Sequence, residues 1–308
     1  MKKILLLLLF SMELFASCLE LGVTTGQSCS GNSVHADDIN MNLSSSMQVS
    51  DQHKKVLEIP FYLYSDSNNA IKMTLNHISN LTNNTNETID TTFYYVSRDG
   101  HELLLKEGEP FVLLSANQNG RNGSTKVGLI RIEVNGLSDT QTAGVYHLSS
   151  NLNVNIYNTT QSATGRLRAK GKVKQVSVIG FTNLTAYKQG KEFVDSKVTF
   201  GSLVANRINE EERDIFVKNN TNGEVQVKFE TTPLIHEIHK EYKIDLNYFY
   251  TEDGKSENAI DSNKFFTITQ GKKNGLKVGK MRFVTEKIDK PLVAGKYSAT
   301  INATVRAK

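Results

Sequence analysis

The chain has 308 residues, a formal net charge of +4 and 22% charged residues. This small positive charge is spread along the chain, without the basic clusters expected of a nucleic-acid-binding protein. Asn, Thr, Ser and Lys are abundant and Trp is absent, which is typical of strands with well-solvated faces.

The first residues have the pattern of a secretory signal peptide. Lys2 and Lys3 precede an apolar run at residues 4–10, and the small residues Ala16 and Ser17 follow it. The apolar run is too short to span a bilayer. We therefore assign residues 1–18 to a signal peptide and expect an exported protein.

The sequence contains two cysteines, Cys18 and Cys29, and both precede the first predicted sandwich. They can form a disulfide in an oxidising compartment. Alternatively, Cys18 is the lipidated first residue of a lipoprotein, or it is removed with the signal or remains a free thiol. In each case the later strands contain no cysteine and must be held together by their hydrophobic core alone.

A long strand is predicted near the start of the exported chain. Residues 19–35 are rich in Gly and Ser, and we expect them to be irregular. Apolar and polar residues then alternate, and this period of two predicts a strand with one apolar face. Its apolar positions are Ile39, Met41, Leu43, Met47 and Val49.

The remaining chain is a succession of short apolar or alternating runs, separated by Gly, Asn and Asp turn signals. This pattern predicts an all-β fold of two tandem immunoglobulin-like antiparallel β-sandwiches. The one helix-like stretch, residues 234–242, contains His236-Glu237-Ile238-His239. Its histidine spacing does not fit the His-Glu-x-x-His zinc motif. We therefore expect a surface or loop role for it.

The two halves of the chain repeat each other. The apolar runs at 61–75 recur 154 residues later at 215–229, and Tyr94 with its Asp99-Gly100 turn recurs as Tyr248 with Asp253-Gly254. Ala143-Gly144-Val145-Tyr146 recurs 151 residues later as Ala294-Gly295-Lys296-Tyr297. This indicates a tandem duplication. We assign the first sandwich to residues 36–158, a linker to 159–171 and the second sandwich to 172–308.

In each half the last strand follows the Ala-Gly-x-Tyr sequence. In the second half the sequence ends on this strand, so we expect its edge to lack a neighbouring strand. In the first half we expect residues 172–178 to supply that neighbour. The apolar positions that would line the open groove are Tyr297, Ala299, Ile301, Ala303 and Val305.

The segment 294–305, preceded by Pro291-Leu292-Val293, resembles the C-terminal strand of bacterial chaperone–usher fimbrial subunits, most closely those of the alpha class. The resemblance implies pilin-type sandwiches assembled by donor-strand complementation, in which a neighbouring subunit supplies the missing strand. It also implies a role in cell adhesion. The implied partners are other fimbrial subunits, a periplasmic chaperone, an outer-membrane usher and a host glycan or protein receptor. The implied location is the periplasm in transit and then the fimbrium at the cell surface.

The N-terminal strand separates two forms of this hypothesis. If residues 39–49 are a free donor strand, the protein is a shaft subunit; if they pair within their own sandwich, it is a tip adhesin. A two-domain periplasmic pilus chaperone and a secreted carbohydrate-binding β-sandwich are the alternatives.

Catalysis is not expected. The sequence shows no carboxylate pair placed for acid–base chemistry, no Gly-x-Ser-x-Gly elbow and no phosphate-binding loop. We predict that the protein is not an enzyme, has no cofactor or metal and has no nucleic-acid partner.

Overall fold

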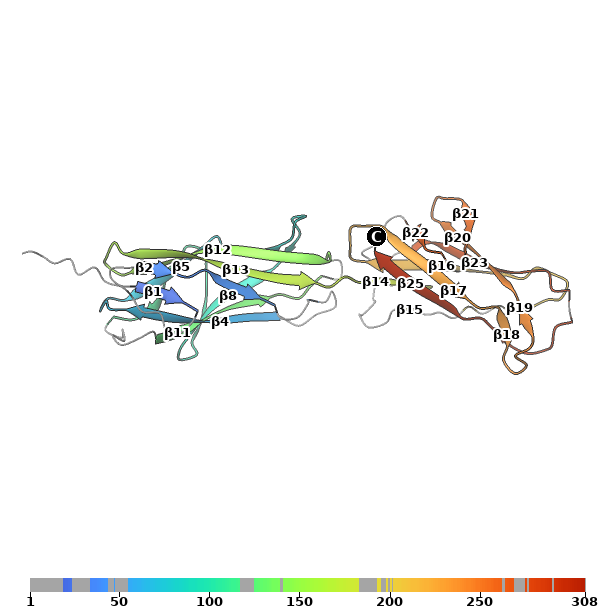
Figure 1. The fold of residues 1–308 in the computed structure, drawn as a ribbon, viewed down its shortest axis with the longest axis horizontal. Coiled ribbons are helices and arrows are strands. Elements are labelled where there is room, and N and C mark those ends of the chain that lie inside the picture. Colours follow the sequence, from blue (N-terminus) through green and yellow to red (C-terminus); the bar gives the residue numbers. More distant parts are fainter. Residues whose placement is uncertain are drawn as a thin grey trace, which may run out of the picture.

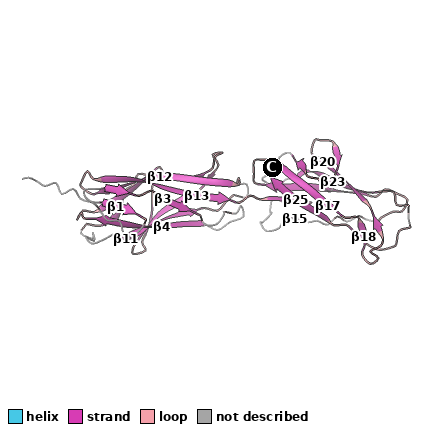
Figure 2. Ribbon diagram, viewed as in Figure 1, coloured by secondary structure: helices cyan, strands magenta, loops and turns pink. Residues whose placement is uncertain are grey.

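The computed structural model describes residues 19–23, 34–43, 47, 55–116, 125–138, 141–182, 193–194, 198, 200, 202–261, 264–268, 275, 277–289 and 291–307. The predicted signal peptide, Cys18, Cys29 and Val49 lie outside these ranges. Strands are the regular elements throughout the described chain, as Figure 2 shows. Within it no helix is long and apolar enough to cross a membrane. The predicted all-β class is confirmed.

The strands form two modules, and β13 of the first leads into β14 of the second (Figure 1). One sheet of the first module has the order β2-β1-β4-β11-β8-β9. Its strands are β1 (Leu19–Gly22), β2 (Val34–Ala36), β4 (Lys55–Ser65), β8 (Thr91–Ser97), β9 (Glu102–Leu104) and β11 (Thr125–Val134). The other sheet has the order β10-β5-β12-β13-β3, and off this path β6 pairs with β12 and β7 pairs with β6. Its strands are β3 (Ile39–Asn42), β5 (Ile71–Asn76), β6 (Leu81–Thr82), β7 (Thr88–Ile89), β10 (Phe111–Leu114), β12 (Gly144–Ile156) and β13 (Ser162–Val173).

The second module repeats the six-stranded sheet of the first, and two shorter sheets take the place of the seven-stranded one. Its six-stranded sheet has the order β15-β14-β16-β23-β20-β21. These strands are β14 (Ser177–Gly180), β15 (Phe193–Val194), β16 (Glu210–Asn219), β20 (Leu246–Glu252), β21 (Glu257–Ala259) and β23 (Lys277–Thr285). Two three-stranded sheets, β22-β17-β25 and β19-β18-β24, complete it. Their strands are β17 (Val225–Thr231), β18 (Leu234–His236), β19 (Lys243–Ile244), β22 (Phe266–Ile268), β24 (Tyr297–Ser298) and β25 (Ile301–Ala307).

The alternation of apolar and polar residues places one row of each strand in the core. The apolar residues of β5 are at most 1% exposed, and those of β17 are fully buried. Each of these strands pairs with the strand that follows the Ala-Gly-x-Tyr sequence of its module, and the register is equivalent: Leu75 lies opposite Leu152, and Phe229 lies opposite Ala303. Leu75 and Phe229 are 154 residues apart, and Leu152 and Ala303 are 151 residues apart, as in the sequence repeats described above. The repeated sequence is therefore also a repeated structure.

The predicted match of Tyr94 with Tyr248 is wrong by one residue. Tyr95 and Tyr250 are the equivalent pair: each is 4% exposed, and each hydroxyl donates a hydrogen bond to a carbonyl of the neighbouring strand, at 2.7 and 3.4 Å. Tyr248 is buried, whereas Tyr94 faces outward. Successive residues of a strand point to opposite faces, so a shift of one residue exchanges core and surface.

Two segments differ from their predicted structure. Residues 19–35, expected to be irregular, contain β1 and all but the last residue of β2, and these two strands pair in parallel. Residues 159–171, expected to be a linker, lie mostly in β13. The chain between the modules is therefore shorter than predicted and lies between β13 and β14.

Asn220 fixes this short connection and is 1% exposed. Its side-chain oxygen accepts the N–H of Val176 at 2.7 Å, and its side-chain nitrogen donates to the carbonyl of Lys174 at 2.9 Å. Its backbone N–H donates to the carbonyl of Val176 at 3.1 Å, and its own carbonyl accepts the N–H of Ala143 at 2.8 Å. The last bond joins the second module directly to the first.

Candidate functional site

The two modules differ most at the strand that follows the Ala-Gly-x-Tyr sequence. In the first module this strand is β12, and β13 runs antiparallel along it, from Ser162 opposite Asn155 to Val173 opposite Gly144. On its far side β13 pairs in parallel with β3. β13 thus fills the space between β12 and β3, and it closes the first module with residues of the same chain.

This closure buries the whole inner row of β12. Its inward side chains from Tyr146 to Ile156 are at most 4% exposed. β13 fits tightly because its inward residues include glycines. A Cβ on Gly171, opposite Tyr146, would lie 2.5 Å from Cδ1 of Leu43 and 2.8 Å from Cε of Met47, closer than atoms pack.

The residues predicted as a donor strand lie in this first module. Ile39, Met41 and Met47 are at most 5% exposed, and Leu43 packs against the same core. The N–H of Met47 donates to the carbonyl of Lys172 at 2.7 Å. Of the two alternatives for this strand, the structure has the one in which it pairs within its own module.

The strand that closes the first module also differs from the prediction. We expected residues 172–178 in this position, but β13 occupies it with residues 162–173. Only the first two residues of the predicted segment pair with β12, and residues 177–180 form β14 of the second module.

In the second module the equivalent strand is β25, and within the described chain its only strand partner is β17. Ile301 is 4% exposed, but the other inward positions are only half-buried. These are Tyr297, Ala299, Ala303 and Val305. The predicted acceptor-strand residues therefore lie along an edge that is incompletely covered, whereas their counterparts on β12 are buried.

A groove of about 510 Å³ lies just before β25, at the predicted acceptor positions Tyr297 and Ala299. One wall is formed by residues 292–299 and the other by Val198, Phe200, Ser202 and Leu203. Val198 and Phe200 also pack against the core of the second module. The order along the chain matches the first module, where β1 and β2 pair in parallel before β3 flanks β13. Here β14 and β15 pair in parallel, and the later residues Val198, Phe200 and Leu203 line the groove.

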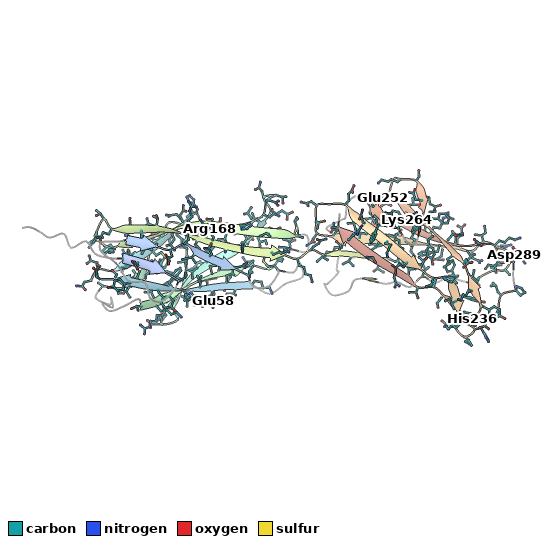
Figure 3. All side chains as sticks on the ribbon, viewed as in Figure 1. Glu58, Arg168, His236, Glu252, Lys264 and Asp289 are labelled. Atoms are coloured by element: carbon teal, nitrogen blue, oxygen red, sulfur yellow. The ribbon has the colours of Figure 1, made fainter. Side chains whose placement is uncertain are left out.

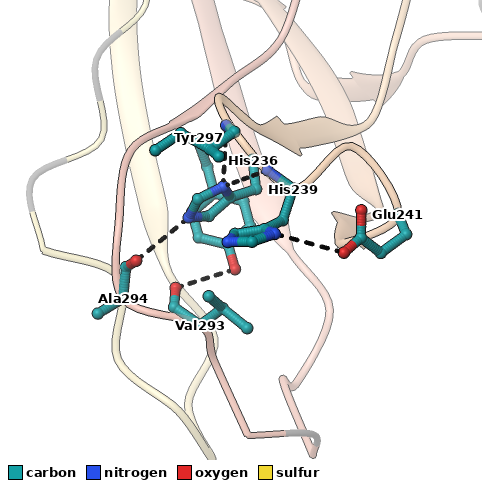
Figure 4. A network of polar contacts seen from close by, with 7 residues as sticks. His236, His239, Glu241, Val293, Ala294 and Tyr297 are labelled. Atoms are coloured by element: carbon teal, nitrogen blue, oxygen red, sulfur yellow. Dashed lines mark hydrogen bonds and ion pairs between the residues drawn. The ribbon is translucent and has the colours of Figure 1, made fainter.

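His236 holds the turn at the mouth of this groove (Figure 4) and is 1% exposed. Its Nδ1 accepts the backbone N–H groups of Ile238 and His239 at 3.1 and 3.0 Å. Its Nε2 lies 3.2 Å from the carbonyl of Ala294, to which it donates. Since Nδ1 accepts two bonds, this ring is neutral with its proton on Nε2. The predicted surface or loop role is wrong for this histidine.

The same ring explains the glycine of the Ala-Gly-Lys-Tyr sequence. Gly295 has φ +152°, and a Cβ there would lie 2.1 Å from Nε2 of His236. The rings of Tyr297 and His236 pack in a T shape, with centroids 5.0 Å apart, and the Tyr297 hydroxyl donates to the carbonyl of Val293 at 3.2 Å. Sequence reasoning did not find this arrangement, because it joins residues about 60 positions apart.

In the first module Tyr146 holds the equivalent turn. Its hydroxyl donates to the carbonyl of Thr142 at 2.8 Å and accepts from the side chains of Gln141 and Asn83 at 2.9 and 3.1 Å. Burial raises the pKa of Tyr146, and the charge of Glu87 raises it further. Both modules therefore begin the strand from a hydrogen-bonded turn of the same kind.

The chemistry available at the open edge is that of strand addition. An unpaired strand edge presents backbone N–H and C=O groups to an added strand, and a row of side chains beneath supplies specificity. In the part of the chain that the structure describes, no group of three His, Cys, Asp or Glu side chains is placed to hold a metal ion.

No protein-family profile matches the sequence, and no curated protein matches it. Among solved structures, the fold is similar to the CsuC–CsuE chaperone–tip adhesion subunit complex of the archaic Csu pili of Acinetobacter baumannii. The TM-score is 0.47 at 13% identity, over 86% of this chain and 98% of that chain. It is also similar to CfaE, the adhesive subunit of the CFA/I fimbria of enterotoxigenic Escherichia coli, with TM-score 0.32 and 10% identity over 97% and 89%. The CupB6 tip adhesin of Pseudomonas aeruginosa gives 0.35 and 10% over 87% and 92%. Each is a similarity of fold at low sequence identity.

Proposed function

We propose that this protein is the tip adhesin of a chaperone–usher fimbrium, and that its second module takes a donor strand from the next subunit. Before assembly a periplasmic chaperone would cover the same edge, and the usher would exchange it for the next subunit. The role is adhesive and not catalytic. The observation that carries the proposal is the contrast between β12, covered by β13, and β25, which has no covering strand among the described residues.

The first module supplies a template for the proposed strand. β13 covers β12 and then continues directly into the second module. The chain segment that leads into the second module therefore supplies the covering strand of the first module. In the same way, a following subunit would supply the covering strand of the second module. Transferring the register by 151 residues predicts a donor that runs antiparallel to β25, with partners from Gly295 to Arg306.

Side-chain size predicts what this donor carries. On β12 the large Leu148 faces the small Ala169, and the small Ser150 faces the large Leu167. By the same offset, the positions of Leu148 and Leu152 become Ala299 and Ala303 in the second module. A core packs at nearly constant density, so the donor residues opposite these two alanines should be large and apolar.

The position of β3 supports the tip over the shaft. The strand that would serve as a free donor is part of the core of the first module, where Ile39 and Met47 are fully buried. Withdrawing it would expose the far edge of β13 and empty the core beneath.

The test is a peptide that completes the second module. The peptide copies the β13 sequence with leucine in place of Gly165 and Ala169, so that bulky groups meet Ala299 and Ala303. At about 100 times its Kd it should stabilise the second module by about 2.7 kcal/mol, which raises the Tm of a module of this size by roughly 5–10 °C. Hydrogen-exchange mass spectrometry should show new protection along β25.

The unmodified β13 peptide is the matched control, since it has the same length and charge. It should bind more weakly, because each fully buried leucine contributes about 1.5–3 kcal/mol. A full-length protein whose β25 amides are already protected, or a Tm that neither peptide changes, would refute the proposal.

A further inference from the structure

Basic residues occupy every second position at the end of β13 and beyond it. They are Arg166, Arg168, Lys170, Lys172 and Lys174. In a strand this spacing places side chains on one face, here the outer face of the β5-β12-β13-β3 sheet, because the alternate residues Leu167, Ala169 and Val173 are buried. The charge that looked evenly spread in the sequence is therefore locally concentrated.

This outer face differs from the outer face of the opposite sheet. There Arg131 forms two hydrogen bonds of 2.6 Å with Glu102. On β13 only Arg168 has an ion pair among the described residues, at 2.8 Å from Asp38. Figure 3 labels Arg168 and Glu58 on opposite sides of the first module. Like charges in a row repel one another, so an anion bound here would relieve that repulsion.

A groove of about 670 Å³ crosses β12 at this face. On one side it is lined by Ser79, Asn80 and Thr82, and on the other by Asn40, Asn42, Arg168 and Lys170, with His147 and Ser149 between them. Hydroxyl and amide groups of this kind both donate and accept hydrogen bonds. The register sets His147 beside Lys170, and Ser149 beside Arg168.

Two of the lining groups are held in place. Arg168 is fixed by Asp38, whose other oxygen accepts the backbone N–H of Arg166 at 2.9 Å. The side chain of Asn80 is fixed by Asp90 and by the N–H of Thr91, at 2.9 and 3.0 Å. The groove thus has preformed walls, while Lys170 is exposed beside it.

We propose that this groove binds an acidic saccharide, with its carboxylate or sulfate on Lys170 and Arg168 and its hydroxyls on Asn40, Asn42 and Ser149. The inference deepens the adhesive role proposed above and rests on it, since it names the receptor chemistry. A saccharide fits better than a nucleic acid, because the groove offers hydroxyls and amides but no Phe, Tyr or Trp ring on which bases would stack.

The test is calorimetric titration of the full chain at low salt with 3′-sialyllactose, 3-sulfated lactose and lactose. The two acidic sugars distinguish a carboxylate from a sulfate as the anchor, and either one should bind at least 10-fold more tightly than lactose. The preference should shrink at 0.5 M salt, because screening weakens exposed charges.

Two matched variants locate the site. Lys170→Gln should weaken acidic-sugar binding at least 10-fold, whereas Lys126→Gln, which removes the same charge from the opposite sheet, should change it less than 2-fold. Equal binding of lactose, no effect of Lys170→Gln, equal effects of both variants, or binding of a DNA oligomer in place of sugars would overturn the inference. The donor peptide acts on the second module alone, so its failure would not change the sugar result.

Discussion

Replacing Gly295 with alanine tests whether the buried histidine sets the mouth of the acceptor groove. At φ +152° a residue with a Cβ is strained by roughly 1–2 kcal/mol. The new Cβ would also displace the ring of His236, which makes three hydrogen bonds, each worth about 1 kcal/mol. We therefore expect Gly295→Ala to destabilise the second module by about 3–5 kcal/mol.

The first module provides the control. Gly144 has φ +147°, but a Cβ there meets nothing within 4 Å, so Gly144→Ala should show the backbone strain alone, about 1–2 kcal/mol. Urea unfolding gives the free energies, and hydrogen-exchange mass spectrometry assigns each loss to its module. In a His236→Ala background the effect of Gly295→Ala should fall to that of Gly144→Ala. Equal losses for the two glycine variants in the wild-type background would show that the contact with His236 is not important.

Three further predictions concern the closed module, the junction and pH. Leu167→Ala, which removes a buried side chain from β13, should destabilise the first module by about 2–5 kcal/mol. The control Thr164→Ala, at an outward position, should change the stability by no more than about 0.5 kcal/mol. Similar urea midpoints for the two variants would contradict the assignment of β13. Asn220→Ala removes two side-chain hydrogen bonds, which should destabilise the junction between the modules by about 1–3 kcal/mol. NMR relaxation should then give a separate tumbling time for each module. Unchanged joint tumbling would contradict the role of Asn220 at the junction. Burial raises the pKa of Tyr95 and Tyr248 to about 12, above the unfolded value of about 10. The neutral form is favoured in the folded state, so this stability is complete below pH 10 and is lost as pH rises from 10 through 12, by up to about 2.7 kcal/mol for each tyrosine. Tyr95→Phe should remove its share of the alkaline loss in thermal melts, and an unchanged slope would count against burial as the cause.

The core strands were predictable because each has one buried face. In β5 and β17 the apolar residues alternate with polar ones, and the Ala-Gly-x-Tyr sequence marks the start of β12 and of the β24–β25 segment. The aromatic strand was misaligned because tyrosine occurs on both faces: Tyr94 is an outward residue, and Tyr95 is the buried one. Only the pairing with β11 distinguishes them.

β13 could not be recognised from its local sequence. Its inward positions include Gly165 and Gly171, which read as linker residues. In the structure these glycines permit close approach: a Cβ on Gly165 would lie 2.8 Å from the carbonyl oxygen of Asp37. The residues that require these glycines flank β3 on both sides and are more than 120 residues away. β3 itself pairs with β13 in parallel, so no period in β13 predicts it. The alternating basic residues from Arg166 to Lys174 are also present in the sequence. That they share one outer face could be inferred only once β13 was recognised as a strand.

Under the proposed function, the two modules face the same packing problem with different connectivity. β13 is joined to β12 by the short turn of residues 157–161, so its effective concentration beside β12 is of millimolar order or more. A strand from another subunit lacks this advantage and has to offset the free energy of association through its own contacts. The small side chains of Ala299 and Ala303 provide the room for such contacts, because they let the donor bury large apolar groups where β13 has only Ala169 and Gly165. The difference in size between the inner rows of β12 and β25 is therefore what we expect if one strand is covered by its own chain and the other must hold a strand that arrives separately.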